Sequence, residues 1–165
     1  MTDFTFKPGV GLGVLDLGFT PEQVTEHLGQ PESVEEIVSD DNANNLEEKT
    51  VSYEYPDQGL SLQFFYYDNI FEGYQIFAGT LTVGGKNWFE LPEAEVLAEV
   101  RALHKAHGKD VLFQRAEEEG EVYLFYPNLG LTLWFEGGEL TDSCISAVLT
   151  AEQLDDMSDE FELEK

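Results

Sequence analysis

The chain has 165 residues, of which 42% are hydrophobic and 13% aromatic, so it can bury a core and is not disordered throughout. Its formal net charge is −26: residues 1–85 hold 15 acidic and 2 basic side chains, and residues 86–165 hold 19 and 6. Such a field repels nucleic acid and anionic membranes and favours a basic partner, although an acidic surface also serves solubility.

The N-terminal residues Met1–Lys7 contain no charged-then-apolar leader, and no apolar run approaches the roughly 20 residues that span a bilayer. The single cysteine, Cys144, cannot form an internal disulfide, which fits a reducing compartment. Its neighbours Ser143 and Ile145 supply no base that would activate the thiol. We therefore expect a cytoplasmic protein in which Cys144 is a small packing residue.

A short first helix is predicted at residues 21–28. Thr20 is a typical N-cap, Pro21 suits the first helical position, and Gln23 completes a capping box. Gly29 follows as the stop. The polar stretch that comes next, Ser39–Lys49, has the composition of a mobile loop.

Two segments further along resemble each other at an offset of 71 residues. Residues 55–65 read Tyr-Pro-Asp-Gln-Gly-Leu-Ser-Leu-Gln-Phe-Phe, and residues 126–136 read Tyr-Pro-Asn-Leu-Gly-Leu-Thr-Leu-Trp-Phe-Glu, with six identities. The same offset places Pro21 on Pro92, at the starts of two predicted helices. The sequence therefore predicts an internal duplication.

Each copy reads as a helix followed by an antiparallel meander of three strands. The second helix opens at Pro92 and stops at Gly108. We predict an α+β fold of two tandem helix-plus-three-stranded antiparallel meander repeats, with the helices on one face of the sheet. The first repeat covers residues 1–84, the second residues 85–149, and an acidic tail residues 150–165. The predicted strands lie at 51–55, 60–67 and about 74–83 in the first repeat, and at 122–126, 131–136 and about 143–149 in the second.

Side chains alternate between the two faces of a strand, so these strands predict a buried and an outward face. The leucines and phenylalanines at 60, 62, 64, 131, 133 and 135 would face the helices. Aromatic side chains supply most of the binding energy in protein interfaces, and a bare sheet face that carries several of them is typical of a binding surface. Alternatively, the two copies bend together, or a dimer forms, and the rings are buried. The predicted partner-binding residues are Phe65, Tyr67, Tyr123, Phe125 and Trp134.

The segment Gly18–Pro31 resembles the motif Gly-Met-Thr-x-x-Gln-Val-x-x-x-Leu-Gly-x-Pro of the SmpA/OmlA (BamE) lipoprotein family, with Phe19 in place of methionine. It is also similar to the helix-opening segment of the beta-lactamase inhibitor protein family, which is built from two helix-plus-sheet repeats. The resemblance implies the fold rather than the function. In the inhibitor family a concave sheet grips an enzyme, and cytosolic immunity proteins, which neutralise toxins, share this architecture.

Catalytic, metal and cofactor signatures are missing from the sequence. His104 and His107 lack a third ligand at useful spacing, and the calcium-like run that begins at Asp40 lacks the required glycine and glutamate. We expect no cofactor, no metal and no enzymatic activity. The leading hypothesis is a bacterial inhibitor or immunity protein that neutralises a basic toxin or enzyme. The alternatives are a small-ligand-binding or enzymatic domain with its site between the repeats, and a homodimer that uses the aromatic face.

Overall fold

The computed structural model describes residues 5–41, 46–156 and 158–163. It is mostly β, with 49% strand and 24% helix. The elements are β1 (Phe6–Lys7), β2 (Gly11–Leu12), β3 (Leu15–Asp16), α1 (Pro21–Leu28), β4 (Ser33–Asp41), β5 (Leu46–Tyr55), β6 (Leu60–Tyr67), β7 (Ile70–Ala78), β8 (Thr82–Val83), β9 (Lys86–Asn87), α2 (Glu93–Ala106), β10 (Leu112–Glu118), β11 (Glu121–Tyr126), β12 (Leu131–Glu136), β13 (Glu139–Ile145), α3 (Ala151–Asp156) and β14 (Glu162–Leu163), with 3-10 turns at Pro56–Gln58, Trp88–Glu90 and Ser158–Glu160.

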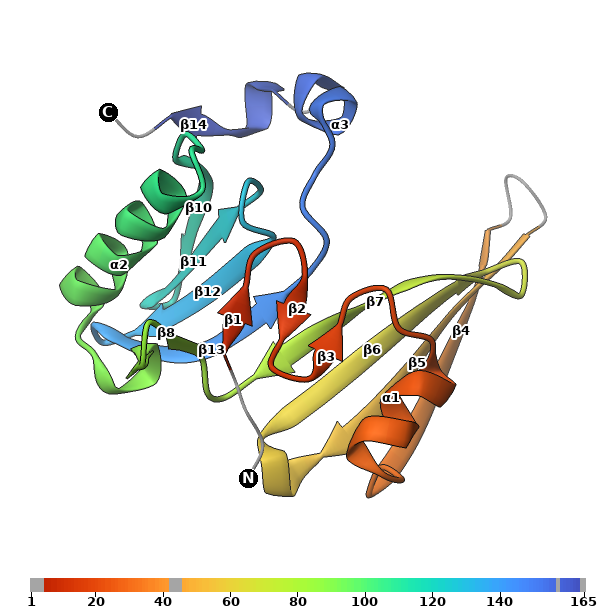
Figure 1. The fold of residues 1–165 in the computed structure, drawn as a ribbon. Coiled ribbons are helices and arrows are strands. Elements are labelled where there is room, and N and C mark those ends of the chain that lie inside the picture. The colour runs from red at the N-terminus through yellow and green to blue at the C-terminus, as the bar shows by residue number, and fades with distance from the viewer. Residues whose placement is uncertain (1–4, 42–45, 157, 164–165) are drawn as a thin grey trace.

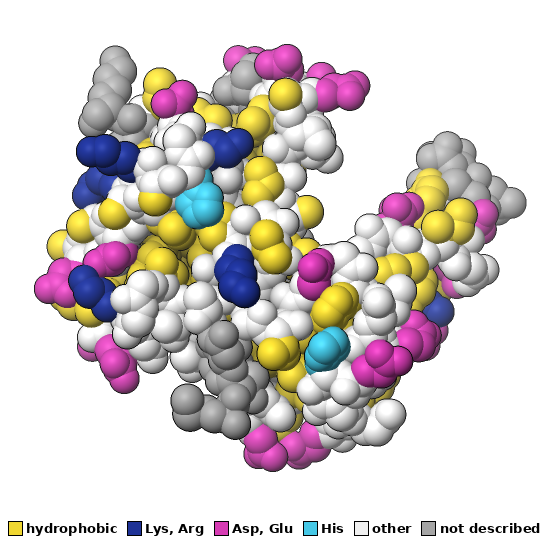
Figure 2. All heavy atoms as spheres, in the orientation of Figure 1, with side chains coloured by type: hydrophobic (Ala, Val, Ile, Leu, Met, Phe, Trp, Pro, Cys, Tyr) yellow, Lys and Arg dark blue, Asp and Glu magenta, His cyan; other side chains and the backbone are white. Residues whose placement is uncertain are grey.

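One antiparallel sheet of nine strands forms the body of the molecule, in the order β14-β10-β11-β12-β13-β7-β6-β5-β4 (Figure 1). Its two halves meet where β13 pairs with β7 through only three residue pairs, Ser143 with Ala78, Cys144 with Phe77, and Ile145 with Ile76. Beyond these pairs the two halves diverge, and Figure 2 shows a broad hollow between the β4–β7 arm and the part that carries the C-terminal segment.

The predicted fold of two helix-plus-three-strand repeats is wrong. The structure holds a single nine-stranded sheet and, within the described residues, three α-helices, and the chain runs through four strands of this sheet after each of α1 and α2. The prediction missed three strands of this sheet, namely β4, β10 and the short β14. Strands β4 and β10 are rich in charged side chains that are mostly exposed. They lack the alternation of apolar and polar residues that identifies a half-buried strand.

The stretch Ser39–Lys49, predicted as a mobile loop, is largely strand. Residues 39–41 end β4 and residues 46–49 begin β5, and the two strands pair from Ser33 with Glu54 to Asp41 with Leu46. Their backbone pairing outweighs a local composition that favours a loop. Most of the turn between them, at 42–45, lies outside the described residues, and so does part of the calcium-like run.

Helix α1 begins and ends where the sequence predicts. Thr20 Oγ1 accepts a hydrogen bond from the Gln23 N–H at 3.3 Å, and Gln23 Oε1 accepts one from the Thr20 N–H at 2.9 Å, so the capping box is complete. The Gly29 N–H donates to the Thr25 carbonyl at 2.8 Å and closes the last turn. In α2, by contrast, Pro92 is the N-cap rather than the first helical residue.

The core lies between the sheet and a cover made of α1, α2 and the N-terminal segment β1–β3, which lies between the two helices in Figure 1. Val24 of α1 and both Val96 and Val100 of α2 are buried in it. None of the helices among the described residues is long and apolar enough to cross a membrane. The six side chains predicted to face the helices are all buried, namely Leu60, Leu62, Phe64, Leu131, Leu133 and Phe135.

The similar segments 55–65 and 126–136 form equivalent structures: each ends one strand, turns through a left-handed glycine and starts the next strand. The two glycines, Gly59 at φ 68° and Gly130 at φ 63°, differ in their surroundings. A Cβ on Gly59 would meet open space, whereas a Cβ on Gly130 would lie 2.1 Å from the Ser146 carbonyl oxygen. The second turn is therefore locked against the chain that leaves β13.

This difference predicts unequal costs for the same substitution at the two turns. Gly59→Ala should lower the free energy of unfolding by about 1 kcal/mol, because only the left-handed backbone disfavours alanine. Gly130→Ala should lower it by about 3 kcal/mol or more, since a clash with backbone is added. Urea unfolding of the two variants measures the difference, and equal costs would contradict the close approach at Gly130.

Candidate functional site

The face of the sheet opposite α1 and α2, which we call the open face, carries all five predicted partner-binding residues. Tyr123 and Trp134 form a cross-strand pair between β11 and β12, and Phe125 lies two residues along β11 on the same side. On β6, Phe65 and Tyr67 alternate with the buried Phe64 and therefore point to the open face as well. The structure thus brings together, on one surface, residues from both halves of the chain.

Ring contacts connect part of this set. The centroids of Tyr123 and Trp134 lie 5.8 Å apart in an edge-to-face arrangement, and Trp134 stacks on Phe77 at 6.2 Å. Phe77 comes from β7 in the other half of the sheet, so this stack crosses the junction between the halves. Sequence reasoning did not single out Phe77, although its alternation with the buried Ile76 and Ala78 would have assigned it to the open face.

Three adjoining hollows run along the open face and share lining residues. The central hollow, of about 400 Å³, lies where the halves of the sheet diverge, and Phe65, Gln75, Tyr123, Phe125 and Thr132 help to line it. Tyr123 also lines a hollow of about 530 Å³ with Trp134. Phe65 lines one of about 270 Å³ with Tyr67, which Lys49 also borders although its strand position directs its side chain to the helix side. The five predicted residues therefore belong to one continuous, indented surface.

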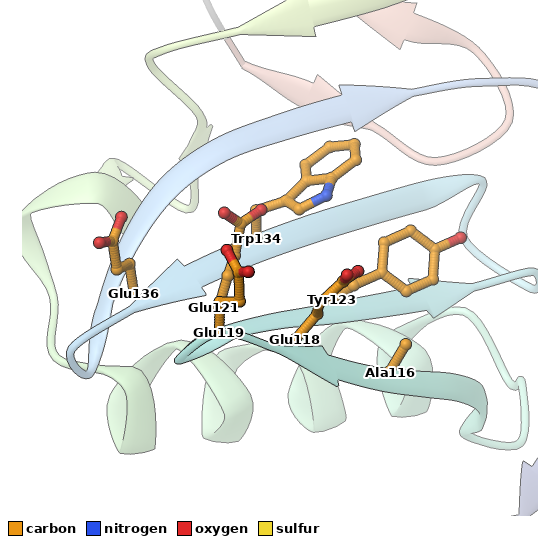
Figure 3. Close-up of a pocket in the computed structure, with 7 residues that line it drawn as sticks. All are labelled: Ala116, Glu118, Glu119, Glu121, Tyr123, Trp134 and Glu136. Atoms are coloured by element: carbon orange, nitrogen blue, oxygen red, sulfur yellow. The ribbon is translucent and has the colours of Figure 1, made fainter.

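The largest of these hollows combines aromatic rings with carboxylates. Figure 3 shows Tyr123 and Trp134 rising from the sheet on the side away from α2, beside the acidic side chains of the β10–β11 turn. Ring faces and carboxylates both attract a cationic side chain such as arginine or lysine. The acidic residues that line this hollow are Glu118, Glu119, Glu121 and Glu136.

Basic side chains are absent from the described strands of the open face. The only Lys or Arg residues in the described part of the nine-stranded sheet are Lys49 and Arg115, and their strand positions direct both to the helix side. There Lys49 contacts Glu36 at 3.8 Å and Arg115 contacts Glu117 at 2.8 Å. Figure 2, which views the helix side, shows the other basic side chains mainly around α2.

Burial disfavours the charged forms of three polar groups in the middle of the open face. Burial raises the pKa of the Cys144 thiol to about 12, and the nearby Asp142 carboxylate adds to this effect. Burial also raises the pKa of Tyr123 and of Asp142, although the Ser143 N–H, which donates to Asp142 at 2.9 Å, opposes the rise for Asp142. The shared cause of these shifts is that burial removes water that would stabilise the charged form of each group.

Among the described residues, no group of three or more His, Cys, Asp and Glu side chains could hold a metal ion. His104 is fully buried, its Nδ1 lies 2.8 Å from the Val100 carbonyl oxygen, and its ring packs edge-on against Tyr126 at 5.6 Å. His107 is the C-cap of α2. The two histidines thus take separate structural positions.

The acidic C-terminal segment reaches the border of the open face. Its capping box at Thr150 and Gln153 is formed, and α3 follows. Strand β14 then pairs with β10 through two residue pairs, and Phe161 places its ring 5.9 Å from that of Phe125. The tail therefore covers part of one predicted contact residue.

These features define a class of protein: an antiparallel sheet with one face covered by helices and the other left as an indented surface of aromatic and acidic side chains. No family model, curated protein or solved structure matches the chain. The resemblances to the SmpA/OmlA and inhibitor families, and the proposed division into repeats at residues 84 and 149, stay predictions.

Because the Cys144 thiol is buried with a pKa near 12, it should be inert in the folded protein. At pH 8 we expect a disulfide reagent to label it at least 100-fold more slowly than in the urea-unfolded chain. The folded pKa lies above the reference value of 9.0, so the folded state holds this proton more tightly and loses stability as pH rises from about 9 towards 12. Rapid labelling of the native thiol would contradict its burial.

The contact between the rings of Phe161 and Phe125 predicts that Phe161 is the side chain that mainly holds β14 against β10. Aromatic pairs contribute about 0.5–1.5 kcal/mol, so Phe161→Ala should speed hydrogen exchange in β14 and in the paired part of β10 by about 3- to 10-fold. Leu154→Ala, in α3, is the matched control and should leave β10 unchanged. Equal exchange in both variants and the wild type would show that Phe161 does not hold the tail.

Proposed function

We propose that this chain is a non-enzymatic inhibitor or immunity protein that binds a basic protein through the open face and neutralises it. The observation that carries the proposal is the placing of all five predicted aromatic residues on one face that holds carboxylates and, in its described strands, no basic side chain. Aromatic side chains provide local binding energy, and the negative field speeds association with a positive surface.

Several acidic residues lie at both ends of the open face, on either side of the aromatic centre. Glu35 and Glu48 lie on strands at one end, and Glu121 and Glu136 at the other. A partner that covers the centre would therefore bring its basic residues against this acidic border. We place this encounter in the cytoplasm of a bacterium, because the only cysteine is a buried free thiol, which suits a reducing compartment.

The test is capture of a partner from the lysate and secretome of the native host, followed by binding of the purified partner. Trp134→Ala combined with Phe125→Ala should weaken binding by about 100-fold or more, since each such residue contributes about 2 kcal/mol. The matched control is Phe19→Ala, which removes an aromatic ring that stacks on His27 of α1. Circular dichroism and urea unfolding verify that each variant is folded.

The supporting result is a stoichiometric basic protein whose activity the wild type and Phe19→Ala inhibit and the double variant does not. Binding that the double variant retains would contradict the assignment of the open face, and a partner with an acidic surface would contradict the role of the charge. Concentration-dependent sedimentation that Trp134→Ala abolishes would instead indicate a homodimer through this face.

The central hollow favours a second candidate function, small-ligand binding between the halves of the sheet. Gln75 and Thr132 supply hydrogen-bonding groups beside the rings of Phe65 and Phe125. A small aromatic ligand fits this lining, because pockets for such ligands are mostly apolar with a few placed polar groups. A thermal-shift screen in which Gln75→Ala removes the stabilisation would support this alternative, which the protein-binding proposal does not require.

A further inference from the structure

The outer edge of β4 is a long strand edge without a partner in the described part of the chain. The sheet ends at β4 on this side, whereas at its opposite end the tail strand β14 covers β10. Strand β4 pairs with β5 through nine successive residue pairs with no break in register. Proteins commonly blunt such edges with charged side chains, bulges, proline or short strands. Strand β4, with the sequence Ser-Val-Glu-Glu-Ile-Val-Ser-Asp-Asp, has acidic side chains, which disfavour acidic strands, but none of the other three devices.

Apolar side chains are exposed on both sides of this edge. Val34 and Val38 point to the helix side and are 58% and 50% exposed, and Ile37 points to the open face and is 53% exposed. Large apolar residues exposed along one strand edge would pack against a strand added beside it. The edge thus offers apolar contacts as well as backbone hydrogen-bonding groups.

Two adjacent carboxylates stand between these apolar residues. Glu35 points to the open face and Glu36 to the helix side, where Lys49 contacts it at 3.8 Å and leaves its side chain 55% exposed. Read from residue 34 to residue 38, the edge presents an apolar, two acidic and two apolar side chains. A strand beside it gains most if its own side chains follow the complementary pattern, because directly opposite pairs interact most strongly.

We propose that β4 receives an extended segment of a partner protein as an additional antiparallel strand, and that this segment carries two adjacent basic residues flanked by β-branched residues. In an antiparallel pairing, the side chains of the partner segment opposite residues 38, 37, 36, 35 and 34 would be apolar, apolar, basic, basic and apolar. The sequence Val-Ile-Lys-Lys-Val has this order. A second copy of this chain is disfavoured as the occupant, since it would bring another charge of −26 and an acidic strand to this edge. This edge adjoins the open face, with which it shares Glu35, but it does not include the aromatic residues of that face.

The experiment uses the full chain and a synthetic peptide, Thr-Val-Ile-Lys-Lys-Val-Thr, with capped ends in 0.15 M salt. A control peptide has the same side chains and charge but is N-methylated at alternate backbone amides, so it cannot complete a strand ladder. Calorimetry gives the affinities, and hydrogen exchange by NMR locates the protected amides. We expect the first peptide to bind at least 10-fold more tightly than the control and to slow exchange in residues 33–39.

Two variants separate local charge from net charge. Glu35→Lys combined with Glu36→Lys should weaken peptide binding at least 10-fold, whereas Glu152→Lys combined with Asp155→Lys, which changes the net charge equally on α3, should change it less than twofold. Should the first variant fail to fold, the comparison of the two peptides on the wild type still decides the matter.

The proposal is overturned if both peptides bind equally, if neither binds at millimolar concentration, or if the protected amides lie outside β4. Trp134→Ala combined with Phe125→Ala should bind the peptide as the wild type does, because the open face is not involved. Loss of peptide binding in that variant would assign the peptide to the open face and contradict the strand addition, without contradicting the proposed function.

Discussion

The three residue pairs between β13 and β7 are the constraint on which the binding surface depends. Beside them, the fully buried Ser143 hydroxyl donates a hydrogen bond to the Ala78 carbonyl at 2.8 Å, so this polar side chain at the junction has a partner within the protein. This short ladder aligns a five-stranded half, β14 and β10–β13, with a four-stranded half, β4–β7, and lets Phe77 of one half stack on Trp134 of the other. Without it, each half would carry its own small set of aromatic residues, and the central hollow would not form.

The cover on the opposite side makes the two faces of the sheet unequal. Phe6, Leu12 and Leu15 of the N-terminal segment join the same buried cluster as Val24 and Val96 of the two helices, so the core is continuous across both halves. The Tyr74 hydroxyl, which donates to the Asp16 carbonyl, ties this segment to β7. Apolar side chains that point to the cover are thereby fixed, and strand alternation then directs the aromatic side chains to the open face, where ring contacts such as those of Trp134 with Tyr123 and Phe77 hold them.

The sequence predicted correctly those structural features that depend on interactions between residues close together in the chain. The capping box of α1, the left-handed glycine turns and the alternation in β6 and β12 depend on residues close together in the chain, so the side of the sheet on which Phe65 and Trp134 lie could be read directly. Strands β4 and β10 could not be predicted from the sequence. Their charged side chains are exposed, and these segments become strands only because they pair with a neighbouring strand. The contact of Phe77 with Trp134 depends on the β13–β7 register, which joins residues far apart in sequence.

The distribution of charge argues that acidity has a role beyond solubility. On the helix side, Lys49, Arg115 and Lys86 each contact a glutamate, so part of the negative charge is locally compensated there. The described strands place no basic side chain on the open face, and its carboxylates therefore act together on whatever approaches. A need for solubility alone would not keep the basic side chains of the sheet off one face. A face whose described strands carry carboxylates and no basic side chain attracts positively charged surfaces, which is the electrostatic basis of the proposed function.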